Sequence, residues 1–454
     1  MSFRLRGRDC VFASTHWMAA ACAALCAASP AALDIKPLWT AEANMVMEGA
    51  PIVVDLDGDG AAEVLAAAYE NIIVVDGSGH ERWRFDTRGR YSTCPAVLER
   101  ADAPALIFAG DNTGLFTCLD GAGAVVWQAE IAPVFCSGPA LADLDGDSAI
   151  EVIQGDKSGA VSVFDALTGA AVWKKSIDGE CSSPAVGDLD GDGTIEIVIA
   201  TGAGKVFALD AHGEVRWELA LGGTSPDWAT CSPILFADSA GRVCVAAASP
   251  EQRFCCIDAQ GELVWQRPTR GAVASTISAG DPDGDGRADL FVVTQLGVLY
   301  RFDEAGRVIW DIDTQGRSLA SGAILDLDGD GTSEYVLCTQ QGNLLVFNES
   351  GEVVFNHQFD NRTINVTPAF GDIVVDRPGL AFAITGGESG RIFCFGAPAA
   401  VDVPAQWRTY RCDNRLTGAW LGLAAQDRVT MTPENLNWDL LLTGDDVTFR
   451  IANP

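Results

Sequence analysis

Five short stretches place carboxylates at a spacing suited to holding a divalent cation. The clearest runs from Asp188 to Glu196 and reads DLDGDGTIE, with carboxylates at positions 1, 3, 5 and 9 and glycines at positions 4 and 6. Calcium takes roughly six to eight oxygen ligands, and a short acidic loop that turns sharply at a glycine supplies them. The pattern predicts about five structural Ca²⁺ sites. The candidate ligands are Asp55, Asp57, Asp59 and Glu63; Asp143, Asp145, Asp147 and Glu151; Asp188, Asp190, Asp192 and Glu196; Asp281, Asp283, Asp285 and Asp289; and Asp326, Asp328, Asp330 and Glu334.

Each acidic loop lies between two extended segments, which indicates a β-hairpin with the cation at its tip. The loop at Asp188 follows the small-residue segment 181–187 and runs directly into the apolar run 197–200. These loops are shorter than an EF-hand and lead into a strand and not a helix. They resemble the FG-GAP repeats of integrin α-subunit propellers and many secreted bacterial proteins. The resemblance implies calcium in the loop between the first and second strands of a propeller blade.

An internal period sets the architecture that positions these loops. A tryptophan follows a glycine-containing turn at intervals of 44 to 48 residues, and a phenylalanine takes the last equivalent place. A period of about 40–50 residues with four short strands is typical of propeller blades. Within one unit the sequence predicts strands at 182–188, 196–201, 206–210 and 214–219. The markers are Trp39, Trp83, Trp127, Trp173, Trp217, Trp265, Trp310 and Phe355.

The first and last markers predict how the array closes. Trp39 precedes any first strand of a blade, whereas the final unit, from about 367 to 395, has no aromatic fourth strand of its own. We therefore expect the Trp39 strand to complete the last blade, because closure removes exposed sheet edges. The predicted fold is an all-β, eight-bladed propeller. Seven blades is the alternative, if the unit at 368–396 packs outside the ring.

The repeats differ in their acidic loops. The second, fifth and eighth units lack the ligand set, and the eighth keeps only Asp372 in that frame. The third unit has Ser148 at loop position 6, where glycine is usual, so we expect a weaker site there. The sixth has Pro282 at position 2, which we expect to be tolerated because no backbone donor is needed there.

Four domain segments are expected along the chain. Residues 1–32 resemble an export signal, with Arg4, Arg6 and Arg8 before an apolar stretch too short to span a bilayer. Residues 33–398 form the propeller, and residues 399–420 form a tail that packs on it. Residues 421–454 contain an alternating apolar pattern around Thr443 that indicates a short β-hairpin, or the start of an incomplete domain. We expect a monomer that is secreted, periplasmic or on the cell surface, with no transmembrane segment.

The charge balance limits the partners. The formal net charge is −32, from 30 basic and 62 acidic residues. The five loops hold a large share of the carboxylates, so much of the imbalance belongs to the candidate cation sites. An acidic surface argues against nucleic acid as a partner, since phosphate binding requires basic residues.

The fourteen cysteines leave disulfide bonding open. Cys118, Cys256 and Cys394 share one position in the third strand of their units, where a buried thiol packs as a small hydrophobic group. Cys136, Cys181 and Cys231 would begin neighbouring innermost strands, and packed thiols are favoured there over a disulfide between blades. Cys255 and Cys256 are adjacent, and a vicinal disulfide between them is an alternative to two free thiols.

A second resemblance concerns the tryptophans. The segments 164–173 and 206–217, which end in Trp173 and Trp217, are similar to the tryptophan-docking motif of PQQ-type propellers. That family favours eight blades, and its quinoprotein dehydrogenases carry a quinone and a metal over the central channel. Residues that would hold the quinone cannot be matched in this chain, so PQQ is not expected as a cofactor.

The sequence offers few residues for catalysis. Its four histidines, His16, His80, His212 and His357, fall in the leader, in turns or on an outer strand, and every clustered carboxylate pair belongs to an acidic loop. A histidine-dependent triad is therefore disfavoured, and no catalytic residue is assigned. We expect a non-enzymatic binding or adhesion module for a protein or glycan. A PQQ-dependent dehydrogenase and a polysaccharide lyase are the alternatives.

The expected ligand surface is one mouth of the channel. The loops that join the fourth strand of a blade to the next blade gather there, on the face opposite the acidic loops. They carry arginines and aromatic residues that suit carboxylates, sulfates or sugars. The candidates are Arg90, Tyr91, Trp228, Arg270, Arg317 and Arg362.

Overall fold

The computed structural model divides the chain into Met1–Ala31 and Ala32–Pro454. Described residues occur only in the second unit, so the expected export signal at 1–32 lies outside them. The structure describes residues 33–44, 46–47, 49–91, 94–101, 103–135, 137–224, 231–273, 275–359, 366–374, 379–387, 389–398, 405–421, 442–443 and 446–447. None of these residues forms a helix with the length and hydrophobicity that crossing a bilayer requires.

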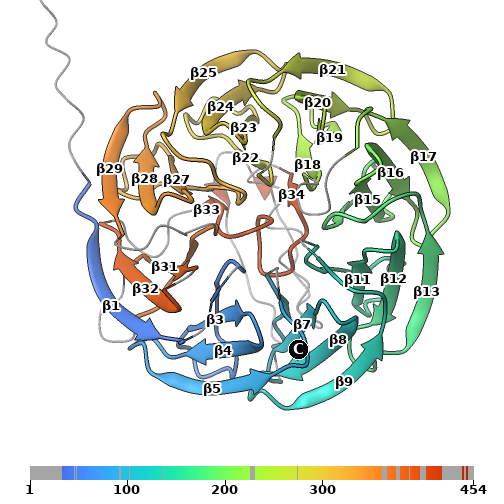
Figure 1. The fold of residues 1–454 in the computed structure, drawn as a ribbon. Coiled ribbons are helices and arrows are strands. Elements are labelled where there is room, and N and C mark those ends of the chain that lie inside the picture. The colour runs from blue at the N-terminus through green and yellow to red at the C-terminus, as the bar shows by residue number, and fades with distance from the viewer. Residues whose placement is uncertain are drawn as a thin grey trace, which may run out of the picture. The chain divides into compact units, whose positions relative to one another are not determined.

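Eight blades of four antiparallel strands form a ring, and two of the blades gain a fifth strand from the segment 405–420 (Figure 1). Blade 1 contains β2 (Ile52–Val54), β3 (Glu63–Ala68), β4 (Asn71–Val75) and β5 (Glu81–Asp86); blade 2 contains β6 (Ala96–Leu98), β7 (Leu106–Gly110), β8 (Leu115–Asp120) and β9 (Val125–Glu130). Blade 3 contains β10 (Ala140–Ala142), β11 (Glu151–Gly155), β12 (Ala160–Asp165) and β13 (Ala171–Ser176); blade 4 contains β14 (Ala185–Gly187), β15 (Glu196–Thr201), β16 (Lys205–Leu209) and β17 (Val215–Ala220).

The second half of the ring repeats this order. Blade 5 contains β18 (Ile234–Ala237), β19 (Val243–Ser249), β20 (Arg253–Ile257) and β21 (Leu263–Pro268); blade 6 contains β22 (Ser278–Gly280), β23 (Asp289–Val293), β24 (Val298–Asp303) and β25 (Val308–Asp313). Blade 7 contains β26 (Ala323–Leu325), β27 (Glu334–Cys338), β28 (Asn343–Phe347) and β29 (Val353–Gln358); blade 8 contains β30 (Ala369–Gly371), β31 (Ala381–Gly386), β32 (Arg391–Gly396) and β1 (Lys36–Glu42).

The N-terminal strand closes the ring. β1 pairs antiparallel with β32, with Trp39 opposite Cys394, so one blade is assembled from the two ends of the repeat region. The Arg391 guanidinium adds a hydrogen bond to the Glu42 carboxylate at 2.8 Å. The prediction of eight blades and of this closure is confirmed, and the seven-blade alternative is wrong.

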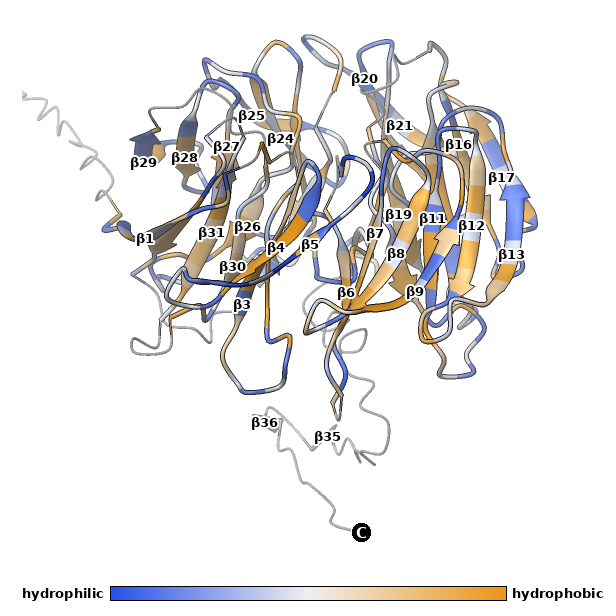
Figure 2. Cartoon of the chain, turned by 60° about the horizontal axis from the view of Figure 1, so that its bottom comes forward, coloured by the Kyte–Doolittle hydropathy of each residue, from blue (hydrophilic) through white to orange (hydrophobic). Residues whose placement is uncertain are grey.

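Burial follows position within a blade. The second and third strands are almost entirely buried, whereas the outer strand β13 alternates exposed and half-buried residues. Figure 2 shows the same contrast, with β12 mostly hydrophobic and hydrophilic stretches on β13 and β17. Side chains of a strand point alternately to opposite faces, so an outer strand buries one face against the next blade and solvates the other.

Seven tryptophans tie each blade to the next. Each lies on the outermost strand and donates its indole N–H to a carbonyl in the turn between the third and fourth strands of the following blade. The N···O distances are 2.8–3.1 Å for Trp39 to Gly77, Trp83 to Gly121, Trp127 to Ala166, Trp173 to Ala211, Trp217 to Ala259, Trp265 to Glu304 and Trp310 to Glu349. A positive-φ glycine in the same turn lies under each ring, where a Cβ would collide with the indole.

The exception, Phe355, occupies the one junction where this turn does not exist. Blade 8 takes its fourth strand from the N-terminus, so no tight turn joins β32 to β1. An indole N–H at this position would have no turn carbonyl to meet, and a phenyl ring fills the space without a donor. Here the Leu33 N–H bonds to the Val354 carbonyl instead.

Glycine substitutions test the docking interaction. Gly213 has φ +80°, and an added Cβ would lie 2.9 Å from the Trp173 ring, whereas Gly241 has φ +75° with nothing within 4 Å. Gly213→Ala combines backbone strain with overpacking and is expected to lower the free energy of unfolding by about 2–4 kcal/mol. Gly241→Ala carries only the strain and should cost about 1 kcal/mol. Urea denaturation of both variants measures the difference, and equal losses would contradict the docking role.

Candidate metal centres

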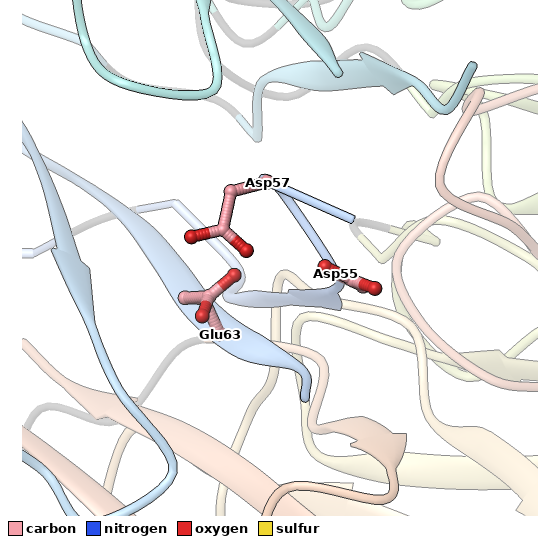
Figure 3. Close-up of side chains that lie close together, drawn as sticks. All are labelled: Asp55, Asp57 and Glu63. Carbon is pink, nitrogen blue, oxygen red and sulfur yellow. The ribbon is translucent and has the colours of Figure 1, made fainter. Parts of the chain in front are cut away.

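Each of the five acidic loops connects the first and second strands of its blade and gathers three carboxylates. In every group one oxygen from each of the three residues lies within 4.8 Å of the others. Figure 3 shows the group in blade 1, with Asp55 and Asp57 on the loop and Glu63 on β3. The groups are Asp55, Asp57 and Glu63; Asp143, Asp145 and Glu151; Asp188, Asp190 and Glu196; Asp281, Asp283 and Asp285; and Asp326, Asp328 and Glu334.

The spacing of these oxygens suits one shared cation. Calcium–oxygen bonds are about 2.3–2.6 Å, so two oxygens on one ion lie at most about 5 Å apart. The three donors of each group fall inside that limit. An all-oxygen set of hard carboxylates fits calcium better than softer transition metals. The residues present therefore fit the ion that the sequence predicts.

The carboxylate at position 5 has another role in four loops. Asp59, Asp147, Asp192 and Asp330 are absent from the groups and accept the backbone N–H of the residue two places on, at 2.7–2.9 Å. These side chains shape the turn, as aspartate commonly does in tight loops. Only in blade 6 does position 5, Asp285, join the group.

The backbone N–H at position 2 does have a task, which corrects the expectation for Pro282. In the other four loops this N–H donates to the glutamate at position 9, as from Leu189 to Glu196 at 2.9 Å. Proline lacks that donor. In blade 6 the buried Arg301 guanidinium donates to Asp289 instead, and it also reaches Asp283 at 2.6 Å. Asp289, at position 9, is not part of the blade 6 group.

Arginines neutralise part of the charge in two further loops, which the sequence reading missed. Arg82 bonds Asp57 at 2.7 Å and also Glu63, and Arg216 makes the same pair of contacts with Asp190, at 2.7 Å, and Glu196. Both arginines immediately precede a docking tryptophan. The residue type just before the tryptophan could have indicated these ion pairs from the sequence, because blade 3 has Val172 at that position in place of an arginine.

The loops of blades 3 and 7 keep their carboxylates without an arginine among the ion pairs of the described residues. Burial raises the pKa of Glu151 to about 7, with further upward contributions from Asp145, Asp143 and Asp147. Burial likewise raises the pKa of Glu334 to about 8, and the neighbouring aspartates add to it. In each case the backbone N–H from position 2 opposes the shift. These two clusters are therefore the ones that most lack a compensating positive charge.

The predicted ligand surface is only partly exposed. Arg90 lies over the Tyr69 ring at 4.5 Å, and Arg270 pairs with Asp311. Arg317 hydrogen-bonds to Gln340. Tyr91 is 1% exposed, so it presents no free ring at the mouth. Trp228 and Arg362 lie outside the described residues.

Residues 405–421 fill the middle of the ring. β33 (Ala405–Trp407) pairs with β26, and β34 (Ala419–Trp420) pairs with β18, and both lie inside the circle of inner strands in Figure 1. Between them the backbone follows the inner strands, accepting N–H bonds from Val97, Leu141, Val186, Leu235 and Phe370. Side chains of this segment bond Pro51, Val53 and Asp281. The segment thus bonds to the innermost strand of all eight blades or a residue beside it.

Arg411 anchors this segment. Its side chain is fully buried and donates to the carbonyl oxygens of Pro184 and Pro233, both at 2.6 Å. Burial lowers the pKa of the guanidinium to about 10. Two adjacent blades are therefore bridged by one charged side chain that substitutes protein carbonyls for water.

The described cysteines are free thiols. Cys118, Cys256 and Cys394 lie opposite Trp127, Trp265 and Trp39, so the shared third-strand position is confirmed. Cys255 and Cys256 belong to different apolar clusters, which does not favour the vicinal disulfide. Cys136 lies outside the described residues.

Comparison with known proteins identifies the family. A family model described as "Outer membrane protein assembly factor BamB" matches residues 31–186, 68–246 and 227–409. The chain belongs to this family. The overlapping matches agree with the internal repeat, and the resemblance to PQQ-type propellers is confirmed, whereas the FG-GAP resemblance stays a prediction. No curated protein matches the chain.

Solved structures of low identity share the fold. BamB from Moraxella catarrhalis is 16% identical with a TM-score of 0.55, and covers 80% of this chain and 99% of its own. Sqt1 from Saccharomyces cerevisiae is 12% identical with a TM-score of 0.63, and the match covers 80% of this chain and 99% of Sqt1. The quinohemoprotein alcohol dehydrogenase from Comamonas testosteroni is 14% identical with a TM-score of 0.55, and the match covers 82% of this chain and 78% of the dehydrogenase chain.

Replacing Arg411 tests the anchor. Arg411→Leu leaves the Pro184 and Pro233 carbonyls buried without donors, and each unsatisfied group costs about 1–3 kcal/mol. We expect a loss of roughly 3 kcal/mol in unfolding free energy, measured by chemical denaturation. Arg408→Leu is the matched control, because its side chain is exposed and only its backbone carbonyl bonds to the ring. A similar loss in both variants would contradict the specific role of Arg411.

Proposed function

We propose that this protein is an exported, calcium-stabilised propeller that binds a protein or glycan ligand without catalysing a reaction. The observation that carries the proposal is the segment 405–421, whose hydrogen bonds run around the innermost strands of the ring. A propeller whose centre holds its own chain leaves its loops and outer strands as the surfaces for a partner.

The family supports a binding role. Its description names an outer membrane protein assembly factor, and we infer from that name a task of binding other proteins. The similarity to quinohemoprotein dehydrogenases extends to the fold alone at this identity.

Calcium is proposed as a structural ion. Filling the acidic groups would replace repulsion among carboxylates with shared coordination and would stabilise the folded state by mass action. Blades 3 and 7 depend on it most, because no arginine offsets Glu151 or Glu334 among the ion pairs of the described residues. In blades 1 and 4 the ion would compete with Arg82 and Arg216 for the same carboxylates.

The function is tested by offering the folded, calcium-loaded protein three kinds of ligand. The probes are PQQ with calcium and an alcohol, an acidic polysaccharide, and an immobilised panel of sulfated and carboxylated glycans beside outer-membrane protein extract. We expect saturable capture of a protein or glycan, and neither quinone absorbance nor unsaturated sugar product. Stoichiometric PQQ binding with alcohol oxidation would overturn the proposal.

Arg90 and Arg317 supply the matched variants for that assay. If the loop face contacts an anionic ligand, Arg90→Ala combined with Arg317→Ala should weaken capture several-fold and lessen its salt dependence. Arg242→Ala is the control, since Arg242 is an exposed arginine in the loop between β18 and β19 that pairs with Asp238. Unchanged capture by the double variant would remove this face from the proposal.

The calcium sites are tested one loop at a time. Asp328→Asn with Glu334→Gln removes two of the three donors in blade 7 and should lower the bound calcium by one ion per chain, measured by elemental analysis after dialysis. Asp372→Asn is the control, because blade 8 has an aspartate in the same frame but no ligand group among the described residues. An unchanged metal count in the double variant would rule out this loop as a site.

A further inference from the structure

Cys244 and Cys256 face each other on neighbouring strands of blade 5. β19 and β20 are antiparallel, and Cys256 pairs with Ala246, two residues along β19 from Cys244. Residues two apart on a strand share a face of the sheet, so the two thiols occupy a diagonal position on one side. Both are buried, at 7% and 1% exposure. Both belong to the same apolar cluster.

These two thiols differ in pKa from the other buried thiols. Hydrogen bonding with Cys256 lowers the pKa of Cys244 against burial, which raises it; Arg242 also lowers this pKa, whereas Asp238 and Asp258 raise it. The same hydrogen bond raises the pKa of Cys256, and burial adds to it. For Cys118 and Cys338 burial is the largest effect and raises the pKa, the common behaviour of core thiols. A thiol that ionises more readily next to a second thiol is the usual arrangement for disulfide exchange.

The adjacent Cys255 does not compete for this partner. Its thiol donates to the Ala247 carbonyl at 3.2 Å and packs among Val245 and Ile257, in a cluster separate from that of Cys256. Blade 5 is also a blade without an acidic loop, so no cation would secure its hairpins. A covalent tie between β19 and β20 would serve that purpose.

We propose that Cys244 and Cys256 form a disulfide when the chain folds in the presence of a disulfide oxidant. The Cys244 thiolate attacks the oxidant disulfide, and the Cys256 thiolate then displaces the oxidant's remaining thiol from Cys244. The two cysteines lose two electrons and two protons in total, and the oxidant disulfide gains them and leaves as two thiols. In the product the two sulfurs lie at bonding distance, about 2 Å.

The test is peptide mapping of the full chain refolded with oxidised glutathione, then denatured, alkylated and digested. We expect one linked peptide joining Cys244 to Cys256, and a lower melting temperature after reduction. Cys255→Ser should keep the linkage. Cys256→Ser should leave Cys244 alkylated, and the melting temperature of this variant should not change with reductant.

Two results would overturn the proposal. One is complete alkylation of both cysteines after oxidative refolding of the unmodified chain, and the other is a linkage that joins Cys256 to Cys255. Because the mapping uses the unmodified protein, a variant that fails to fold does not affect the outcome. It is also independent of calcium and ligand, so failure of the proposed function would leave it standing.

Discussion

The contact between an indole and the turn of the next blade is the interaction on which the ring depends. It combines a flat apolar surface, which excludes water between blades, with one directional N–H···O bond that fixes their relative height. The turn must present a bare backbone, which is why positive-φ glycines such as Gly213 lie beneath the rings. The rule also explains Phe355, since the closing blade has no turn carbonyl to receive an indole.

The ring brings several carboxylates together in each acidic loop, and their mutual repulsion can be offset in two ways. Acidic loops concentrate like charge at the ends of buried strands, where burial disfavours the ionised form. In blades 1, 4 and 6 a guanidinium from Arg82, Arg216 or Arg301 lies among the carboxylates. In blades 3 and 7 the positive charge would come from solution. The same loop motif is thus used with an internal and an external counter-ion, which makes stability depend on the ionic environment.

The fold could be predicted from the sequence because of its internal repeat. The period of the tryptophans gives the number of blades, and the position of Trp39 before the first blade indicates that its strand completes the last one. Strand boundaries in blade 4 differ from those predicted mainly in the first strand, observed at 185–187. The sequence also predicted the acidic groups. It did not predict the arginines that enter them, because Arg82 and Arg216 come from the fourth strand of the blade, or the donor role of position 2, because a backbone N–H carries no sequence signal. The central segment gave no periodic signal, since it binds mainly through backbone groups that any residue carries.

The most direct test of this account is calcium content combined with thermal unfolding, with and without chelator. The account predicts calcium bound at the five carboxylate groups and a markedly lower melting temperature once it is removed. A protein that binds no calcium and melts at the same temperature in chelator would contradict it. The acidic loops would then be solvated turns, and the arginines in blades 1, 4 and 6 their only compensation among the described residues.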